Sequence, residues 1–173
     1  NITTLPSVPL IGLSLPLQGP TITIDGPKLD VQHFTGGAIA DFNAGANDFD
    51  VRAHQVALTA INEGVDVDSF VVTLGGLPGA ELTKVSSIQM FIDDGDEIFE
   101  PGPMGDDTPI GGPATPAFEG PTQFTLTIPL QNIPVSTTAY FYVAVNFMGA
   151  ADQDMISITI DDITTQQPGV DLI

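Results

Sequence analysis

Ala139-Tyr140-Phe141-Tyr142-Val143-Ala144-Val145-Asn146-Phe147 is the stretch whose pattern decides the fold. Every second residue is a large apolar one, and side chains two positions apart share one face of an extended strand. β-branched and aromatic residues also favour strands over helices. The stretch therefore predicts a half-buried β-strand whose inward face carries Phe141, Val143, Val145 and Phe147.

The same alternation recurs on both sides of this stretch. Its other occurrences are Val51–Ile61, Val67–Leu74, Val85–Ile92, Gln123–Ile128 and Met155–Ile160, with shorter strands expected at Thr21–Ile24 and near Val31–Phe34. Gly, Pro, Asp and Asn separate the runs, and no window shows sustained helical periodicity. About seven or eight short strands predict an all-β fold, an immunoglobulin-like antiparallel β-sandwich or a jelly-roll-like variant of it. Each sheet is expected to have one core face and one Thr/Ser-rich solvated face.

The N-terminal segment alternates just as strictly but is harder to place in the same sheets. In Ile11–Leu17 every odd position is a large aliphatic, so Ile11, Leu13, Leu15 and Leu17 would line one face. The prolines of this segment lack a backbone donor, which disfavours a central place in a sheet. An extended segment of this kind can add a strand to the exposed sheet edge of another molecule. We expect residues 1–19 to be a donor strand and residues 20–173 to be the sandwich domain; an ordinary edge strand is the alternative.

The composition predicts where the protein is found and what it can bind. The 173 residues include 3 Lys+Arg and 22 Asp+Glu, a formal charge of −19 that repels nucleic acids and anionic lipids and attracts cations. Cysteine is absent, and no apolar run is long enough to span a bilayer. The chain begins at Asn1 rather than Met, which predicts a secreted, extracellular or cell-surface form whose signal peptide has been removed. Asn1-Ile2-Thr3 is also a glycosylation sequon, which predicts modification at Asn1.

The chemically richest segment is Asp93-Asp94-Gly95-Asp96-Glu97-Ile98-Phe99-Glu100. Calcium takes about six to eight oxygen ligands from carboxylates, carbonyls and water. The expected ligands are Asp93, Asp94, Asp96, the Ile98 carbonyl and Glu100, with Asp106 and Asp107 able to close the site from the next loop. The spacing differs from that of an EF-hand, and a solvated acidic turn is the alternative. Asp161 and Asp162 are interpreted as the end of a strand.

The motifs of common enzymes are missing from the sequence. His33 and His54 are the two histidines, and they do not form a zinc motif. There is no thiol nucleophile, no Gly-x-Ser-x-Gly elbow and no phosphate-binding loop. We therefore expect a protein that is not an enzyme; a metal-dependent hydrolase built on Asp93–Glu100 is the weakest alternative.

Four runs of the chain together are similar to a known kind of module. They are Val56–Ala60, Val67–Leu74, Val85–Glu100 and Tyr140–Phe147. Across residues 50–162 their pattern resembles secreted prokaryotic β-sandwich modules with an aspartate-rich loop after a central strand, although those more often carry Gly at the position of Glu97 and Asp at that of Glu100. With the N-terminal arm, the whole resembles TasA-like biofilm-fibre subunits and archaeal bundling pilins. In that group each subunit's N-terminal strand completes the sandwich of the next.

These observations predict an archaeal or bacterial homopolymer. The leading prediction is a structural subunit of an extracellular filament, a pilus or biofilm fibre, that assembles head to tail by donor-strand complementation and is stabilised by calcium. Its partner is a second copy of the same chain, because head-to-tail insertion produces an open fibre. The alternative is a calcium-dependent adhesion or carbohydrate-binding module of a cell-surface protein.

Overall fold

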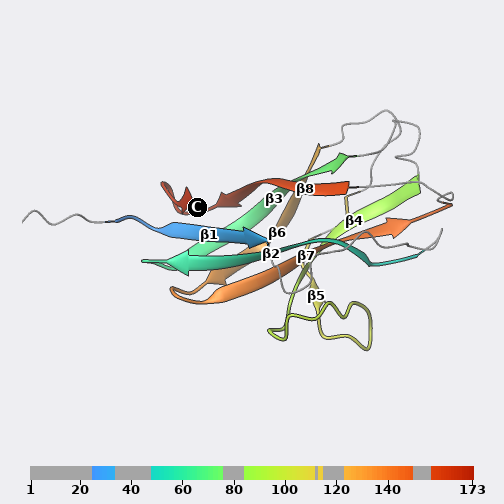
Figure 1. Ribbon diagram of the computed structural model, residues 1–173, viewed down its shortest axis with the longest axis horizontal. Helices are drawn as coiled ribbons and strands as arrows, with labels where there is room; N and C mark the ends of the chain where they lie inside the picture. The colour runs from blue at the N-terminus through green and yellow to red at the C-terminus, as the bar shows by residue number, and fades with distance from the viewer. Residues whose placement is uncertain (1–24, 34–47, 76–83, 112, 115–122, 150–156) are drawn as a thin grey trace, which may run out of the picture.

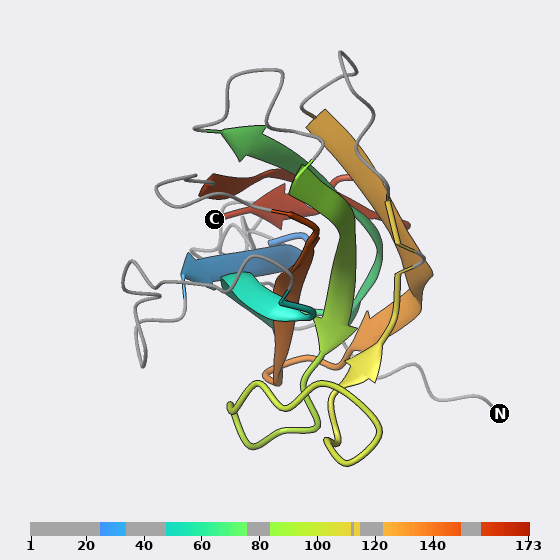
Figure 2. The ribbon, with the colours of Figure 1, turned by 90° about the vertical axis from the view of Figure 1, so that its right-hand side faces the viewer.

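The chain forms two β-sheets packed face to face, seen from two sides in Figures 1 and 2. The computed structural model describes residues 25–33, 48–75, 84–111, 113–114, 123–149 and 157–173. The strands are β1 (Lys28–His33), β2 (Val51–Ile61), β3 (Val65–Gly75), β4 (Val85–Ile92), β5 (Thr108–Pro109), β6 (Gln123–Ile133), β7 (Thr138–Phe147), β8 (Ser157–Thr165) and β9 (Asp171–Leu172). The predicted all-β sandwich is confirmed.

The two sheets differ in size. The larger has the strand order β5-β4-β7-β2-β1-β9 and the smaller the order β6-β3-β8. Neighbouring strands are antiparallel except β1 and β9, which run in parallel. In the described part of the chain, β8 therefore lies at one edge of the smaller sheet, with no strand paired on its outer side.

The core lies between β7 and β3, the strands with the clearest alternation. Phe141 of β7 and Phe70 of β3 are both fully buried, and their ring centroids lie 5.2 Å apart. The other inward residues predicted for these two strands are buried as well: Val72, Leu74, Val143, Val145 and Phe147. The rings of Phe70 and Phe141 fill space between the two sheets. Replacing either residue with Ala would therefore lower the free energy of unfolding by about 3–5 kcal/mol.

The outer face of β7 departs from the expectation of a solvated surface. Tyr142 and Ala144 are each 1% exposed and form a second apolar cluster with Phe91 of β4, against which Phe99 packs. The expectation was wrong here because the acidic segment after β4 folds back over this face of the larger sheet. One side of the larger sheet thus carries a loop, whose position is fixed by aromatic contacts.

The C-terminal strands also differ from the prediction. Asp161 and Asp162 do not end a strand, since β8 continues to Thr165. The side chain of Asp161 accepts hydrogen bonds from Thr73 of β3 and from Gln123 of β6, 3.0 Å away in the second case, so other strands of the same sheet satisfy it without interrupting β8. β9 was not predicted at all, and it is followed by Ile173, whose N–H donates to the Leu29 carbonyl at 3.1 Å.

Several predictions fall outside the described residues. These are the arm at residues 1–19 with Ile11, Leu13, Leu15 and Leu17, the sequon at Asn1 and the strand at Thr21–Ile24. A search of the described residues for a helix long and apolar enough to cross a bilayer finds none.

Candidate functional site

The acidic loop begins where β4 ends and stays attached to the larger sheet. The N–H of Asp93 donates to the Tyr140 carbonyl at 3.0 Å, which extends the pairing of β4 with β7 by one residue. Beyond it, the chain projects from the side of the sandwich as two adjacent loops, drawn in yellow-green at the bottom of Figures 1 and 2.

Phe99 anchors this loop on the sheet. Its ring lies 5.3 Å from that of Phe91 in an edge-on arrangement and 5.0 Å from that of Tyr142. Aromatic pairs at such separations contribute about 0.5–1.5 kcal/mol beyond the area they bury. The ring thus places the preceding carboxylates at a defined position above β4 and β7.

The aspartates of the loop fold it through hydrogen bonds to its own backbone. The Asp93 Oδ2 accepts from the N–H groups of Gly95 at 2.7 Å and Glu97 at 3.2 Å. The Asp96 Oδ1 accepts from the Ile98 N–H at 2.8 Å. The Tyr142 hydroxyl donates to the Asp93 Oδ1 at 2.9 Å, and burial together with this carboxylate raises the pKa of Tyr142, so the hydroxyl remains a donor.

Three predicted ligands meet in this fold. Asp93, Asp94 and Asp96 each place a carboxylate oxygen within 4.8 Å of the others, an arrangement that can hold a metal ion. Glu100 is not in this group of three; its carboxylate lies beside Asp106. Ile98, whose carbonyl was the remaining predicted ligand, is exposed and bonded to Asp96 through its N–H.

Besides Asp93, Asp94 and Asp96, other carboxylates of the two loop segments add negative charge at this site. Proximity to Asp106 raises the pKa of Glu100, and desolvation followed by the charges of Asp106, Asp96 and Asp93 raises the pKa of Asp94 despite a backbone hydrogen bond. Burial is the main cause of the raised pKa of Asp107. Shifts of this direction mean that the ionised carboxylates repel one another or are poorly solvated, a cost that a bound cation would offset.

These shifts predict an unusual pH dependence of stability without divalent cations. A carboxylate whose pKa is higher in the folded than in the unfolded protein takes up its proton first in the folded state, so stability rises as the pH falls. The melting temperature of chelator-treated protein should therefore rise as the pH is lowered from about 7 to about 5. Hydrogen bonds to Thr73 and Gln123 lower the pKa of Asp161, so the ionised form of Asp161 stabilises the folded protein. This contribution is lost only at more acidic pH.

Calorimetry over this pH range checks the prediction. A cation held by the same carboxylates would neutralise them and flatten the dependence. A melting temperature that falls steadily from pH 7 to pH 5 in chelator would contradict the assignment of repulsive charge to this loop.

A second chain segment closes against the first at Gly105. A Cβ at this position would lie 1.7 Å from the Glu100 carbonyl oxygen, so only glycine permits this approach. Two residues later, Asp107 accepts a hydrogen bond from the Glu100 N–H at 2.7 Å. Residues 101–107 thus fold back against the acidic loop.

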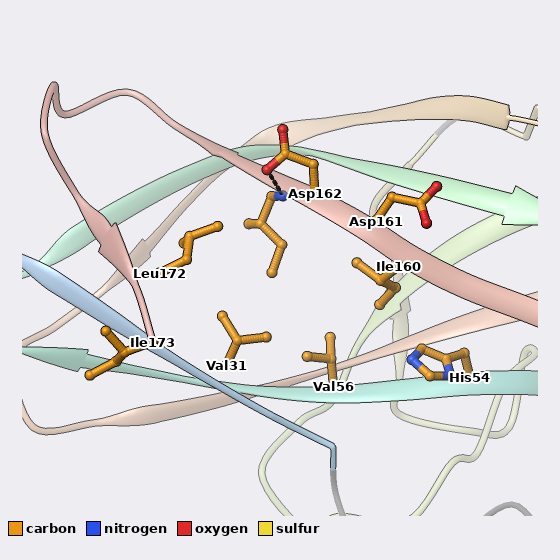
Figure 3. A pocket seen from close by; sticks show the side chains of 9 residues that line it. Val31, His54, Val56, Ile160, Asp161, Asp162, Leu172 and Ile173 are labelled. Carbon is orange, nitrogen blue, oxygen red and sulfur yellow. Dashed lines mark hydrogen bonds between the residues drawn. The ribbon is translucent and has the colours of Figure 1, made fainter.

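The other feature of the surface is an apolar groove between the two sheets. It has a volume of about 290 Å³ and is lined by Val31, His54, Val56, Ile160, Asp161, Asp162, Ile163, Leu172 and Ile173. In Figure 3, Val31 of β1 and Val56 of β2 point across the groove towards Ile160 of β8. The groove therefore runs along β8, the strand with an unpaired edge in the described part of the chain.

Sequence reasoning missed three contributors to these sites. In the sequence, Tyr142 is placed only by the alternation of its strand and Phe99 only by its position in a loop. Neither pattern predicts a contact between a strand and a loop. β9, whose Leu172 lines the groove, is too short to give a periodic signal. No model of a known protein family matches the sequence, and a search of curated proteins finds no significant match.

Proposed function

We propose that this protein is a structural subunit of an extracellular homopolymer, in which residues 1–19 of one copy occupy the groove of the next. The observation that supports this best is the groove itself. It is lined mainly by aliphatic side chains from both sheets and lies beside the edge strand β8. An incoming strand would find backbone groups of β8 to pair with and apolar pockets for alternate side chains.

The arm has the pattern that this groove requires. Large aliphatic residues alternate with Gly, Ser and Pro in this segment, so one face is aliphatic and the other carries small residues. The aliphatic residues are Ile11, Leu13, Leu15 and Leu17. Burying four such side chains contributes about 6–12 kcal/mol before the entropy of ordering the arm is subtracted. A volume of about 290 Å³ lies at the small end of ligand pockets and suits side chains better than a large cofactor.

Complementation in trans tests the proposal. A chain lacking residues 1–19 should be a folded monomer, and a peptide of residues 1–19 should bind it. At a hundredfold excess over its dissociation constant, the peptide should stabilise the truncated chain by about 2.7 kcal/mol, which raises the melting temperature by roughly 5–10 °C. A peptide with Leu13→Asp and Leu15→Asp is the matched control. Polymers formed by the truncated chain would refute the proposal.

We further propose that calcium is the ion held by Asp93, Asp94 and Asp96. Hard carboxylate oxygens on an exposed loop suit an ion that keeps some of its water, and the formal charge of −19 favours any cation. Calcium should raise the melting temperature of the chelator-treated protein more than an equal concentration of magnesium, because calcium tolerates irregular coordination whereas magnesium demands near-ideal octahedral geometry. Equal responses to both ions would argue for general charge screening.

The second candidate is a calcium-dependent adhesion or carbohydrate-binding module. It is favoured by the exposed apolar side chains of Ile98 and Met104, 55% and 101% exposed, which belong to the same two chain segments as the carboxylates. In that case the truncated chain would keep its calcium-dependent binding to a surface or glycan, and the full chain would be monomeric.

A further inference from the structure

Asp107 is the one carboxylate that burial sets apart from the rest of the acidic cluster. It is 4% exposed, and within the described residues no other Asp or Glu is buried to this degree. Its Oδ2 accepts the Glu100 N–H, and the backbone N–H of Asp94 also approaches the carboxylate, while its buried Oδ1 has no partner at hydrogen-bond geometry. Native proteins rarely leave a buried carboxylate oxygen without a partner, because its desolvation is not compensated.

Among the described residues, no salt bridge reaches this charge. The salt bridge found there joins Lys28 to Asp25, far from Asp107 in the sequence. The charges that raise its pKa, after burial, are those of Asp93 and Asp106, which are also negative. A purely structural role, holding the Glu100 N–H, would need only a neutral acceptor such as Asn.

The three aspartates of the loop leave a calcium ion under-coordinated. They supply three carboxylates, whereas calcium takes about six to eight oxygens. Asp107 is held against this loop from below by its bond to the Glu100 N–H and by the close approach of Gly105 to the Glu100 carbonyl. Asp107 is not among the three residues whose oxygens lie within 4.8 Å of one another, but the charge of Asp93 and the backbone N–H of Asp94 both act on its carboxylate. A desolvated oxygen thus lies next to an incomplete ligand set.

We propose that Asp107 is a further ligand of the cation at Asp93, Asp94 and Asp96, so that one divalent ion ties segment 93–100 to segment 101–107. The inference rests on the calcium proposal above and is independent of filament assembly. It makes the ion a cross-link between two loops and explains why a charged residue is buried where an uncharged one would pack at less cost.

Calcium titration of the full chain tests the inference, with the free ion set by a chelating indicator. Asp107→Asn keeps an acceptor for the Glu100 N–H and removes the charge. It should weaken calcium binding at least tenfold, as should Asp96→Asn, while Asp68→Asn on β3 should leave the affinity unchanged. In chelator, Asp107→Asn should melt no lower than the unsubstituted chain, because it removes an uncompensated buried charge and keeps the acceptor for the Glu100 N–H. In saturating calcium it should melt lower than the unsubstituted chain, whereas a merely structural Asp107 predicts no loss that depends on calcium.

A second measurement does not depend on affinity. With terbium bound at saturation, luminescence lifetimes in water and deuterium oxide count coordinated waters, and Asp107→Asn should add about one. If Asp107→Asn does not fold, Asp107→Ser, which also offers an acceptor, takes its place with the same expectations. Unchanged affinity and water count in a folded variant, with Asp96→Asn impaired, would overturn the role of Asp107 alone. Absence of calcium binding by the unsubstituted chain would overturn the whole cation site.

Discussion

Leu13→Asp in the N-terminal arm should convert the proposed polymer into folded monomers. Leu13 lies on the aliphatic face of the alternating segment, so the proposed groove would have to bury a carboxylate in place of an isobutyl group. The lost burial is worth about 1.5–3 kcal/mol, and desolvation of the charge adds to it. The concentration needed for assembly should therefore rise by about 100-fold or more. Light scattering coupled to size exclusion, with electron microscopy of the same sample, measures this.

Ser14→Asp is the matched control for this prediction. It adds the same charge one residue away, on the small-residue face that the alternation turns out of the groove. Assembly of the Ser14→Asp chain should differ little from that of the unsubstituted chain. If both substitutions block assembly equally, the cause is charge repulsion between chains of formal charge −19. The result would then say nothing in favour of an aliphatic face of the arm that enters the groove.

Gly105→Ala should disrupt the proposed calcium site while leaving the sandwich folded. Its methyl group would lie 1.7 Å from the Glu100 carbonyl oxygen, so segments 93–100 and 101–107 must separate. Asp107 would then lose its bond to the Glu100 N–H and its place beneath the loop. Overpacking of this kind costs about 1–3 kcal/mol, and we expect calcium affinity to fall at least tenfold. Isothermal titration gives the affinity and circular dichroism the fold.

Gly26→Ala provides the comparison for this substitution. No atom lies within 4 Å of a Cβ at Gly26, and its backbone is not in the left-handed region. Stability and calcium affinity should therefore stay close to those of the unsubstituted chain. Full calcium affinity in a folded Gly105→Ala chain would show that the two segments need not meet for the ion to bind.

The sandwich could be predicted because alternation reports directly on which side chains share a buried face. Phe141 and Phe70, assigned inward from period two alone, are the rings that meet across the two sheets. The same logic failed at Tyr142, which alternation places outside, because burial there comes from Phe99 on a different segment. Asp161 was read as a strand end, but hydrogen bonds from Thr73 and Gln123 allow β8 to continue through it.

The cation cluster could be predicted in part, for a related reason. Asp93, Asp94 and Asp96 are close in sequence, so any tight turn brings their oxygens together. The burial of Asp107 depends instead on the return of the chain at Gly105, a tertiary contact that spacing does not encode. The groove could not be predicted for the same reason. Its lining residues Val31, Ile160 and Leu172 come together only when both sheets are assembled.

Disulfide trapping tests most directly whether the arm leaves its own subunit. The chain contains no cysteine, so pairs can be introduced without interference. Ile160, which faces the groove in Figure 3, is replaced with Cys and combined in turn with Cys at Ile11, Leu13, Leu15 or Leu17; Ser14→Cys serves as the outward-facing comparison. Oxidation should give at least one doubly substituted chain that forms a ladder of covalent multimers on a denaturing gel. An internally cross-linked monomer with no ladder would mean that the arm packs on its own domain, and the homopolymer account would be wrong.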